Sequence, residues 1–243
     1  MSTIAFHHVT KRYGEVTALD DFTAVAQPGR ITAFLGANGS GKTTSMRLLL
    51  GLAEPTEGSA RIDGHLYHEL VHPVQTIGAV LDQGFHPSRT ARNHLRIVAA
   101  QAGLSTQSPR IEELLHLVDL QGAADRTVGG YSLGMRQRLA LASALVGEPS
   151  ALVLDEPFNG LDPDGIRTMR RMLRHYADGG GTALLSSHLL AEVALSADEL
   201  IVIHRGHLVT SGPVAEIVAG GDDLETTFHN LIHPEDTQQG AWS

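Results

Sequence analysis

Residues 36 to 43 restrict the possible folds of this chain more than any other stretch. They read Gly-Ala-Asn-Gly-Ser-Gly-Lys-Thr and match the pattern G-x-x-x-x-G-K-[ST], with an apolar run at 31–35 before them and helical spacing at 44–50 after them. Glycines at this junction let the backbone curl, so that successive N–H groups and the positive end of the following helix face one point. The segment therefore predicts a phosphate-binding loop between a buried strand and a helix.

The loop also predicts which atoms contact a nucleotide. We expect Lys42 to place its ammonium on the β- and γ-phosphates, and the Thr43 hydroxyl to be an oxygen ligand for Mg²⁺. Lys11 and Lys42 are the only lysines among 18 basic residues, and a lysine here suits a site that needs a point charge rather than a planar guanidinium. The predicted ATP-binding residues of the loop are Gly36, Ala37, Asn38, Gly39, Ser40, Gly41, Lys42, Thr43 and Thr44.

The composition is that of an ordinary globular protein and excludes several functions. The 243 residues are 42% hydrophobic and 19% charged, which is enough for a substantial core. A net charge of −9 argues against general nucleic-acid binding, and the absence of cysteine excludes disulfides and thiolate metal sites. The sequence shows neither a signal peptide nor an apolar run that could cross a bilayer, so we expect a cytoplasmic chain whose membrane role comes through a partner.

The order of predicted strands and helices indicates an α/β fold. The front section is β-rich, with strands at 4–9, 16–25 and 59–62, which predicts an N-terminal antiparallel β-subdomain. The apolar runs at 151–154 and 182–186 are typical of parallel strands that are covered on both faces. Further elements are predicted as strands at 77–81, 200–204 and 207–210 and helices at 163–177 and 189–196. This alternation favours a parallel sheet wound by helices.

A helical insertion separates two parts of this core. Helical periodicity is present at 89–103, 110–121 and 134–147. We therefore expect a nucleotide-binding domain over residues 1–220 with a helical subdomain at about 84–149. The polar residues 221–243 are expected to form an acidic C-terminal tail.

An acidic pair follows the predicted strand at 151–154. Asp155 stands at the carboxyl end of that strand, where an α/β sheet presents its ligand-binding groups, and a carboxylate there can hold Mg²⁺. Glu156 is placed to accept a proton from, or to orient, the water that attacks the γ-phosphate. A pair that only caps the strand is the alternative, but the phosphate loop favours the catalytic role.

Residues 131–138 read Tyr-Ser-Leu-Gly-Met-Arg-Gln-Arg and resemble the signature segment of the ATP-binding cassette (ABC) ATPases, whose consensus is L-S-G-G-Q. Ser132 and Gly134 match this consensus. Leu133 replaces its first glycine and Met135 its glutamine, a variant that resembles the bacterial drug and antibiotic exporter ATPases. A serine hydroxyl and backbone N–H groups at a helix start form a second anion site. The resemblance implies that two chains pair head to tail, with this segment of one closing over the γ-phosphate held by the other.

The resemblance extends over residues 4 to about 219 and assigns further residues. Residues 159–162, Asn-Gly-Leu-Asp, are similar to the D-loop that crosses the dimer seam. His188 matches the switch histidine that contacts the γ-phosphate, and Tyr13 matches the aromatic residue that stacks on adenine. The glutamine loop, whose residue is expected to reach ATP and Mg²⁺, is matched by either Gln83 or Asp82, with Gln83 favoured.

The resemblance implies the ATP-hydrolysing subunit of a bacterial ABC transporter, and the variant signature favours an exporter. It would act as a homodimer or with a paired ATPase chain, on the inner face of the membrane, bound to a separate permease. One alternative is a soluble ABC ATPase of translation or cofactor assembly, but neither a second cassette nor a long coiled coil is present. Another is a phosphotransferase, against which the segment at 131–138 argues.

Three arginines at helical spacing, Arg89, Arg92 and Arg96, form a local basic stripe. A solvated helix face is the simpler explanation for such a stripe. In the family, however, the cleft between the helical insertion and the core receives a short helix of the permease. The resemblance therefore implies docking around residues 82–96, including Phe85.

Overall fold

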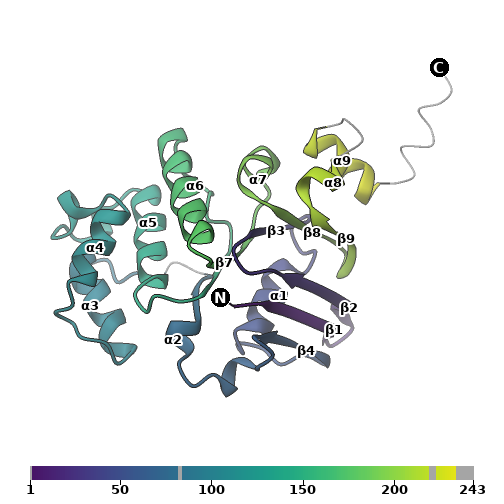
Figure 1. The fold of residues 1–243 in the computed structure, drawn as a ribbon, viewed down its shortest axis with the longest axis horizontal. Coiled ribbons are helices and arrows are strands. Elements are labelled where there is room, and N and C mark those ends of the chain that lie inside the picture. Colours follow the sequence, from purple (N-terminus) through teal and green to yellow (C-terminus); the bar gives the residue numbers. More distant parts are fainter. Residues whose placement is uncertain (1, 82–83, 219–222, 234–243) are drawn as a thin grey trace.

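The computed structural model describes residues 2–81, 84–218 and 223–233, which fold into two β-sheets with helices packed around the larger one (Figure 1). The strands are β1 (Ile4–Tyr13), β2 (Val16–Ala26), β3 (Ile31–Leu35), β4 (Glu57–Ile62), β5 (Ile77–Val80), β6 (Ala151–Leu154), β7 (Thr182–Ser186), β8 (Glu199–His204) and β9 (His207–Pro213). The smaller sheet is antiparallel in the order β2-β1-β4, and the larger has the order β5-β6-β7-β3-β8-β9.

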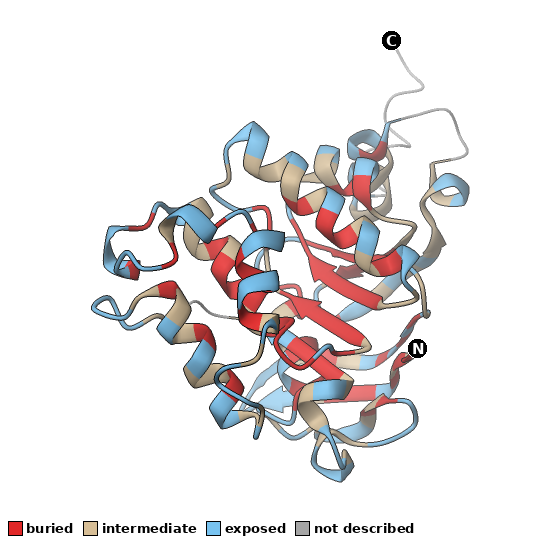
Figure 2. Cartoon of the chain, turned by 60° about the vertical axis from the view of Figure 1, so that its left-hand side comes forward, coloured by how far each residue is buried: buried red, intermediate tan, exposed pale blue. Residues whose placement is uncertain are grey.

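The larger sheet is parallel except at its edge strand β9, which pairs antiparallel with β8. Every residue of β3, β6 and β7 is buried, as expected of strands that are covered on both faces (Figure 2). The predicted parallel core and the predicted antiparallel N-terminal sheet are both confirmed.

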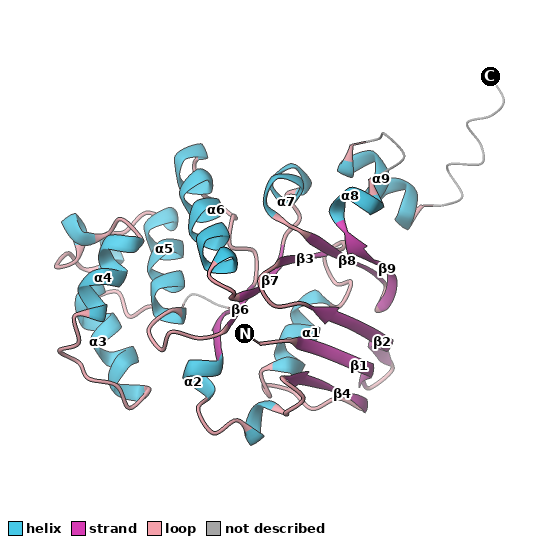
Figure 3. Cartoon of the chain, in the orientation of Figure 1, coloured by secondary structure: helices cyan, strands magenta, loops and turns pink. Residues whose placement is uncertain are grey.

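Helices cover the parallel sheet and also form a group of their own beside it (Figure 3). The α-helices are α1 (Lys42–Leu49), α2 (Pro73–Thr76), α3 (Ala91–Gln101), α4 (Arg110–Leu117), α5 (Leu133–Ala144), α6 (Pro163–Asp178), α7 (Leu190–Ser196), α8 (Val214–Ile217) and α9 (Leu224–Ile232), with short 3₁₀ turns at Tyr67–Glu69, Gln121–Ala123 and Val128–Gly130. Helices α3, α4 and α5 pack on one another, as the sequence predicts for the insertion. Among the described residues, no helix combines the length and apolarity that a membrane crossing requires.

The central strand β3 connects two apolar cores through its alternating side chains. Ile31, Ala33 and Leu35 face the core shared with α5, α6 and α7. Phe34 faces the opposite core, where its ring packs on Phe6 and Phe22 at centroid distances of 5.9 and 5.8 Å. The antiparallel sheet and α1 thus cover one face of the parallel sheet, and the later helices cover the other.

Helix ends differ from the predicted ones for local reasons. Helix α3 begins at Ala91, because the Thr90 hydroxyl accepts a hydrogen bond from the N–H of Asn93 and caps the helix. Helix α4 ends at Leu117, and Asp119 beyond it has a φ of +53°. The four-residue helices α2 and α8 are absent from the prediction. Helix α9 lies within the predicted acidic tail and packs against α7.

Candidate nucleotide-binding site

The loop between β3 and α1 follows a path that only glycine permits. Gly39 and Gly41 have φ angles of +78° and +116°, in the left-handed region that side chains disfavour. A Cβ at Gly41 would lie 2.8 Å from the carbonyl oxygen of Ala18, and a Cβ at Gly36 would collide with the backbone of β8. The loop therefore lies directly against β2 and β8, at the carboxyl end of β3, where the sequence predicts a phosphate site.

Lys42 is held against the carbonyls of its own loop. It is the first residue of α1 and only 6% exposed, and its Nζ donates to Gly36 O at 2.6 Å and to Ala37 O at 3.1 Å. Burial lowers the pKa of Lys42 below its ordinary value, and the nearby carboxylates of Glu156 and Asp155 offset this only in part. An ammonium has three donors, so one remains for a phosphate oxygen.

A chain of hydrogen bonds joins the loop to the ends of β6 and β7. The Thr43 hydroxyl donates to Asp155 Oδ2 at 2.8 Å, and the Ser186 hydroxyl donates to Asp155 Oδ1. The N–H of Glu156 donates to Ser186 Oγ at 2.9 Å. Thr43 and Asp155, both predicted as metal ligands, are therefore in contact. Ser186 was missed, and its only sequence signal is a hydroxyl that directly follows the apolar residues 183–185 of β7.

Thr43 and Asp155 fit a magnesium ion that is shared with a nucleotide. Both offer hard oxygen atoms, and Mg²⁺ needs few protein ligands because it takes most of its ligands from water and phosphate. The described part of the chain contains no group of three His, Asp or Glu side chains that could hold a metal by itself. Gln83 and Asp82, the two alternatives for the glutamine loop, lie outside the described residues.

Glu156 and His188, the two predicted catalytic residues, contact each other. Nδ1 of His188 lies 2.7 Å from Glu156 Oε2, and the backbone N–H of His188 donates to the same oxygen at 3.4 Å. Glu156 has a φ of +52°, which is uncommon for a residue other than glycine and is maintained by its surroundings. Both side chains remain partly exposed, at 25% and 50%, so a reactant can reach them.

The predicted signature segment begins helix α5. The Ser132 hydroxyl caps this helix by accepting from the N–H of Met135 at 3.2 Å. The Tyr131 hydroxyl donates to Ala123 O at 2.7 Å, and Arg136 donates to Tyr131 O at 2.8 Å, so the helix start is anchored to the helical lobe. A pocket of about 340 Å³ opens beside it. Its lining includes Ser132, Leu133, Gly134, Met135, Gly160 and Asp162, and none of the described residues of the phosphate loop.

Tyr13 ends β1 and keeps 49% of its surface exposed. The ammonium of Lys11 lies 4.6 Å from the centre of its ring, a distance typical of a cation–π contact. A ring with this exposure can stack on a flat base, which is the role that the sequence predicts for it.

The arginine stripe at 89–96 is not a uniform basic surface. Arg92 pairs with Glu112 and, through a 2.9 Å contact of its Nε, with Asp125. This hydrogen bond with Arg92 holds the pKa of Asp125 below its usual value. Arg92 therefore ties α3 to α4 and to the turn that contains Asp125, while Arg89 and Arg96 are exposed. Arg92 thus has a structural role within the helical subdomain, and docking of a partner around residues 82–96 stays a prediction.

Comparison with known proteins agrees with this geometry. Residues 19–159 match the ABC transporter family. The chain is 39% identical over 217 residues to the bacitracin transport ATP-binding protein BcrA of Enterococcus faecalis, covering 88% of this chain and 70% of that protein. It is 36% identical over 216 residues to the Nod factor export ATP-binding protein I of Burkholderia orbicola, covering 87% and 71%.

A solved structure described as the ATP-binding subunit of an ABC transporter superposes on this one with a TM-score of 0.84 at 26% identity, covering 94% of this chain and 98% of that one. The family predicted from residues 131–138 is thus confirmed by sequence and by fold. The chain belongs to the ABC transporter family and is one of its ATP-binding and ATP-hydrolysing subunits.

Proposed function

We propose that this chain works as one half of an ATPase dimer that drives export through a separate membrane permease. The contact between Glu156 and His188, beside the Thr43–Asp155 pair, is the observation that supports ATP hydrolysis most directly. Relatives named for bacitracin transport and for Nod factor export favour an exporter. Such a subunit would lie on the cytoplasmic face of the membrane, held there by its permease.

We assign this function to the domain bounds that the sequence predicts. Residues 1–220 would form the nucleotide-binding domain, with α3, α4 and α5 as its helical subdomain at about 84–149. Residues 221–243 would be an acidic tail, whose described part forms α9.

ATP would place its β- and γ-phosphates on the loop at 36–43. Lys42 would form a hydrogen bond to them with its third N–H group. Thr43 and Asp155 would hold the magnesium ion, which neutralises phosphate charge when it is bound. Backbone N–H groups of the loop and the N-terminus of α1 add further positive potential. Tyr13 would stack on the adenine, and Gln83 would contact ATP and the ion.

Glu156 would act as the base for the attacking water. An ionised carboxylate only accepts hydrogen bonds, so the proton shared with His188 belongs to Nδ1, and Oε2 is occupied by this histidine. Oε1 is then available to accept a proton from water. His188 orients the carboxylate and stands where the γ-phosphate is expected.

The start of α5 would complete the site of a partner chain. Ser132 and Gly134 lie at the start of α5, which would bind an anion, and their pocket is separate from the phosphate loop of the same chain. A head-to-tail dimer would set this helix start opposite the γ-phosphate bound by the other chain, and the dimer would close on ATP and reopen after hydrolysis.

Complementation between two inactive variants tests the dimer. A Lys42→Ala chain and a Ser132→Arg chain should each be inactive alone. In a mixed dimer one site carries both defects and the other carries none, so an equal mixture should regain roughly a quarter of wild-type activity if the sites act independently. Crosslinking would verify that mixed dimers form. If they form and the mixture shows no more activity than the separate variants, the sites are not independent sites built from two chains.

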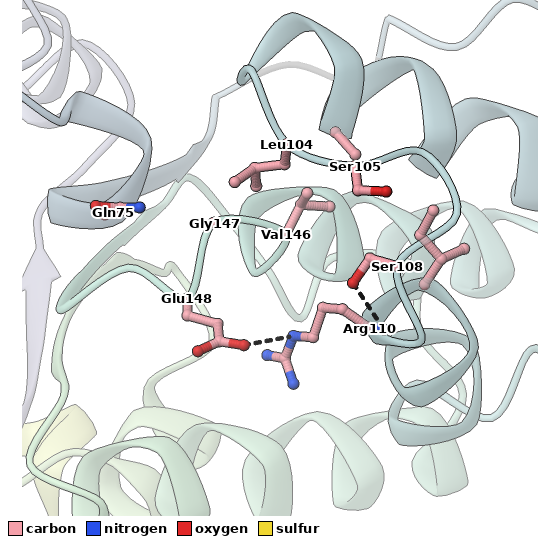
Figure 4. Close-up of a pocket in the computed structure, with 10 residues that line it drawn as sticks. Gln75, Leu104, Ser105, Ser108, Arg110, Val146, Gly147 and Glu148 are labelled. Carbon is pink, nitrogen blue, oxygen red and sulfur yellow. Dashed lines mark hydrogen bonds and ion pairs between the residues drawn. The ribbon is translucent and has the colours of Figure 1, made fainter.

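We infer that the permease contacts a groove between the core and the helical subdomain, which is lined by residues other than the 82–96 predicted from the sequence (Figure 4). A cavity of about 490 Å³ lies there, and a second of about 240 Å³ adjoins it, with Gln75 and Leu104 lining both. Apolar lining comes from Val74, Ala99, Leu104, Ile111 and Val146. At one end Arg110 Nε lies 3.6 Å from Glu148 Oε1. Such a surface suits an amphipathic helix end of the permease.

Two exposed apolar residues allow a matched test of this groove. Val71 lines the smaller cavity and is 84% exposed, and Leu195 on α7 is 70% exposed and does not line it. Val71→Glu should reduce copurification with the permease by about tenfold, because it places a charge against the apolar face of the amphipathic helix. Leu195→Glu should bind the permease normally. Equal retention of both variants would contradict this docking surface.

A further inference from the structure

Two leucines at the starts of α5 and α6 each pack on a glycine of the other segment. Leu133, the first residue of α5, lies over Gly160, where an added Cβ would collide with its Cδ2 atom. Leu161 lies over Gly134, where an added Cβ would be 3.3 Å from the leucine Cδ2. The two contacts are reciprocal, so the two segments interlock.

In each segment, a residue next to the leucine caps a helix. Ser132 caps α5, and Asp162 caps α6 by accepting from the N–H of Gly165 at 2.8 Å. Gly160 has a φ of +70°, which turns the loop towards Leu133. Because each leucine adjoins a capping residue, the contact between leucine and glycine determines how one helix start lies relative to the other.

Leu133 is also the position at which this chain departs from the signature consensus. The consensus has glycine there, whereas this chain has a leucine that is 42% exposed and fills the space above Gly160. The side chain does not close a core. It lies in the wall of the pocket that Ser132, Gly134 and Asp162 also line. The leucine side chain fits there because residue 160 is a glycine and has no side chain.

We propose that Leu133 is a positioning residue for ATP hydrolysis: its contact with Gly160 fixes the start of α5 to the loop at 159–162. Ser132 and Gly134 then meet the nucleotide of the partner chain in one arrangement. This inference rests on the proposed function, because it requires the helix start to act on that nucleotide. Binding of ATP to the phosphate loop of the same chain does not depend on the contact.

Gly160→Ala, with a matched control, tests the contact. Gly103 has a φ of +71° and nothing within 4 Å of an added Cβ, so Gly103→Ala carries the same backbone strain without the collision. Gly160→Ala should lower kcat by about tenfold more than Gly103→Ala, with ATP affinity changed by less than about twofold. ATP affinity is measured by fluorescence titration and folding by thermal melting.

The double variant Leu133→Ala/Gly160→Ala separates the collision from the strain. Removing the leucine side chain removes the contact, so Leu133→Ala alone should lower kcat by about tenfold. It also makes room for the new methyl group, so adding Gly160→Ala to this variant should change kcat by less than about threefold. A double variant about tenfold slower than Leu133→Ala would overturn the proposal, since the strained backbone alone would then explain the loss, and a wild-type kcat for Leu133→Ala would overturn it as well. Equal kcat for Gly160→Ala and Gly103→Ala would overturn it too.

Two further results distinguish this inference from the proposed function. A loss of ATP affinity and melting temperature in Gly160→Ala that accounts for its low kcat would mean a structural role only and would overturn the proposal. Complementation between Lys42→Ala and Ser132→Arg chains is measured in parallel. If complementation fails while the double variant is no slower than Leu133→Ala, the dimer arrangement is wrong, but the contact still positions residues that hydrolysis requires.

Discussion

Glu156 and His188 follow neighbouring strands, and their side chains meet at 2.7 Å between Oε2 and Nδ1. Each is the second residue beyond its strand, because β6 ends at Leu154 and β7 at Ser186. The strands are parallel, with Leu154 in register with Leu185, so His188 lies one residue further along than Glu156. Both residues emerge at the same edge of the sheet, where ligands of α/β proteins bind.

Glu156→Gln should retain ATP but lose turnover. Glutamine keeps the shape of the side chain and cannot take a proton from water, so kcat should fall by about 10²- to 10⁴-fold. Gel filtration with ATP and Mg²⁺ should show a stable dimer. Glu113→Gln, a change on the exposed face of α4, serves as the control. Undiminished hydrolysis would rule out Glu156 as the base.

Lys42→Arg should weaken ATP binding almost as much as Lys42→Ala. The ammonium reaches two loop carbonyls from a position that is 6% exposed, and a planar guanidinium is too large for that space. We expect the affinity for ATP, measured by equilibrium titration, to fall by more than about tenfold in both variants. Binding of wild-type strength in the arginine variant would show that charge alone suffices.

Much of the site could be predicted because its residues lie in local motifs. Lys42 and Thr43 belong to a loop that glycine spacing identifies, and Asp155 and Glu156 follow an apolar strand. Ser186 could not be found in this way, because its contact with Asp155 depends on β6 and β7 being neighbours. The order of strands in a sheet is not a property of any single segment.

Two other features show the same limit. Helical spacing indicated that Arg92 lies on a basic face, but its partner Asp125 comes from a turn 33 residues further along the chain. The short helices α2 and α8 contain only four residues each, which is too few for periodicity to be detected. Local patterns therefore predicted elements and motifs, while contacts between distant segments required the fold.

Asp155→Asn should remove the dependence of ATP binding on magnesium. The carboxylate accepts hydrogen bonds from Thr43 and from Ser186 and brings a negative charge to the ion. An asparagine amide keeps the size of the side chain but has no charge. In the wild-type chain, chelation of Mg²⁺ should weaken ATP binding by about tenfold or more. In the variant, affinity should be low with and without the ion. An unchanged magnesium response would show that the ligands lie elsewhere.

His94 should make the stability of the folded chain sensitive to mild acid. Its Nε2 lies 3.1 Å from Ser143 Oγ, and its ring packs edge-on against Phe85 at 4.9 Å. Ser143 donates its own proton to Leu139 O, so Nε2 of His94 carries a proton and donates to the serine. Burial lowers the pKa of His94 from its ordinary value of 6.5, and the charge of Arg89 lowers it further.

The sign of the pH effect follows from this lowered pKa. The unfolded chain binds a proton at His94 at a higher pH than the folded chain does. The free energy of unfolding should therefore be highest above about pH 6.5 and should fall as the pH drops towards the folded pKa. Each tenfold difference in proton affinity is worth about 1.4 kcal/mol.

Urea unfolding at about pH 7.5 and about pH 5.5 tests this. The free energy of unfolding should fall further between the two pH values in the wild-type chain than in His94→Gln, which keeps a donor for Ser143. His86→Gln, at an exposed histidine nearby, should keep the wild-type loss, and equal losses in all three chains would exclude His94 as the acid-sensitive group.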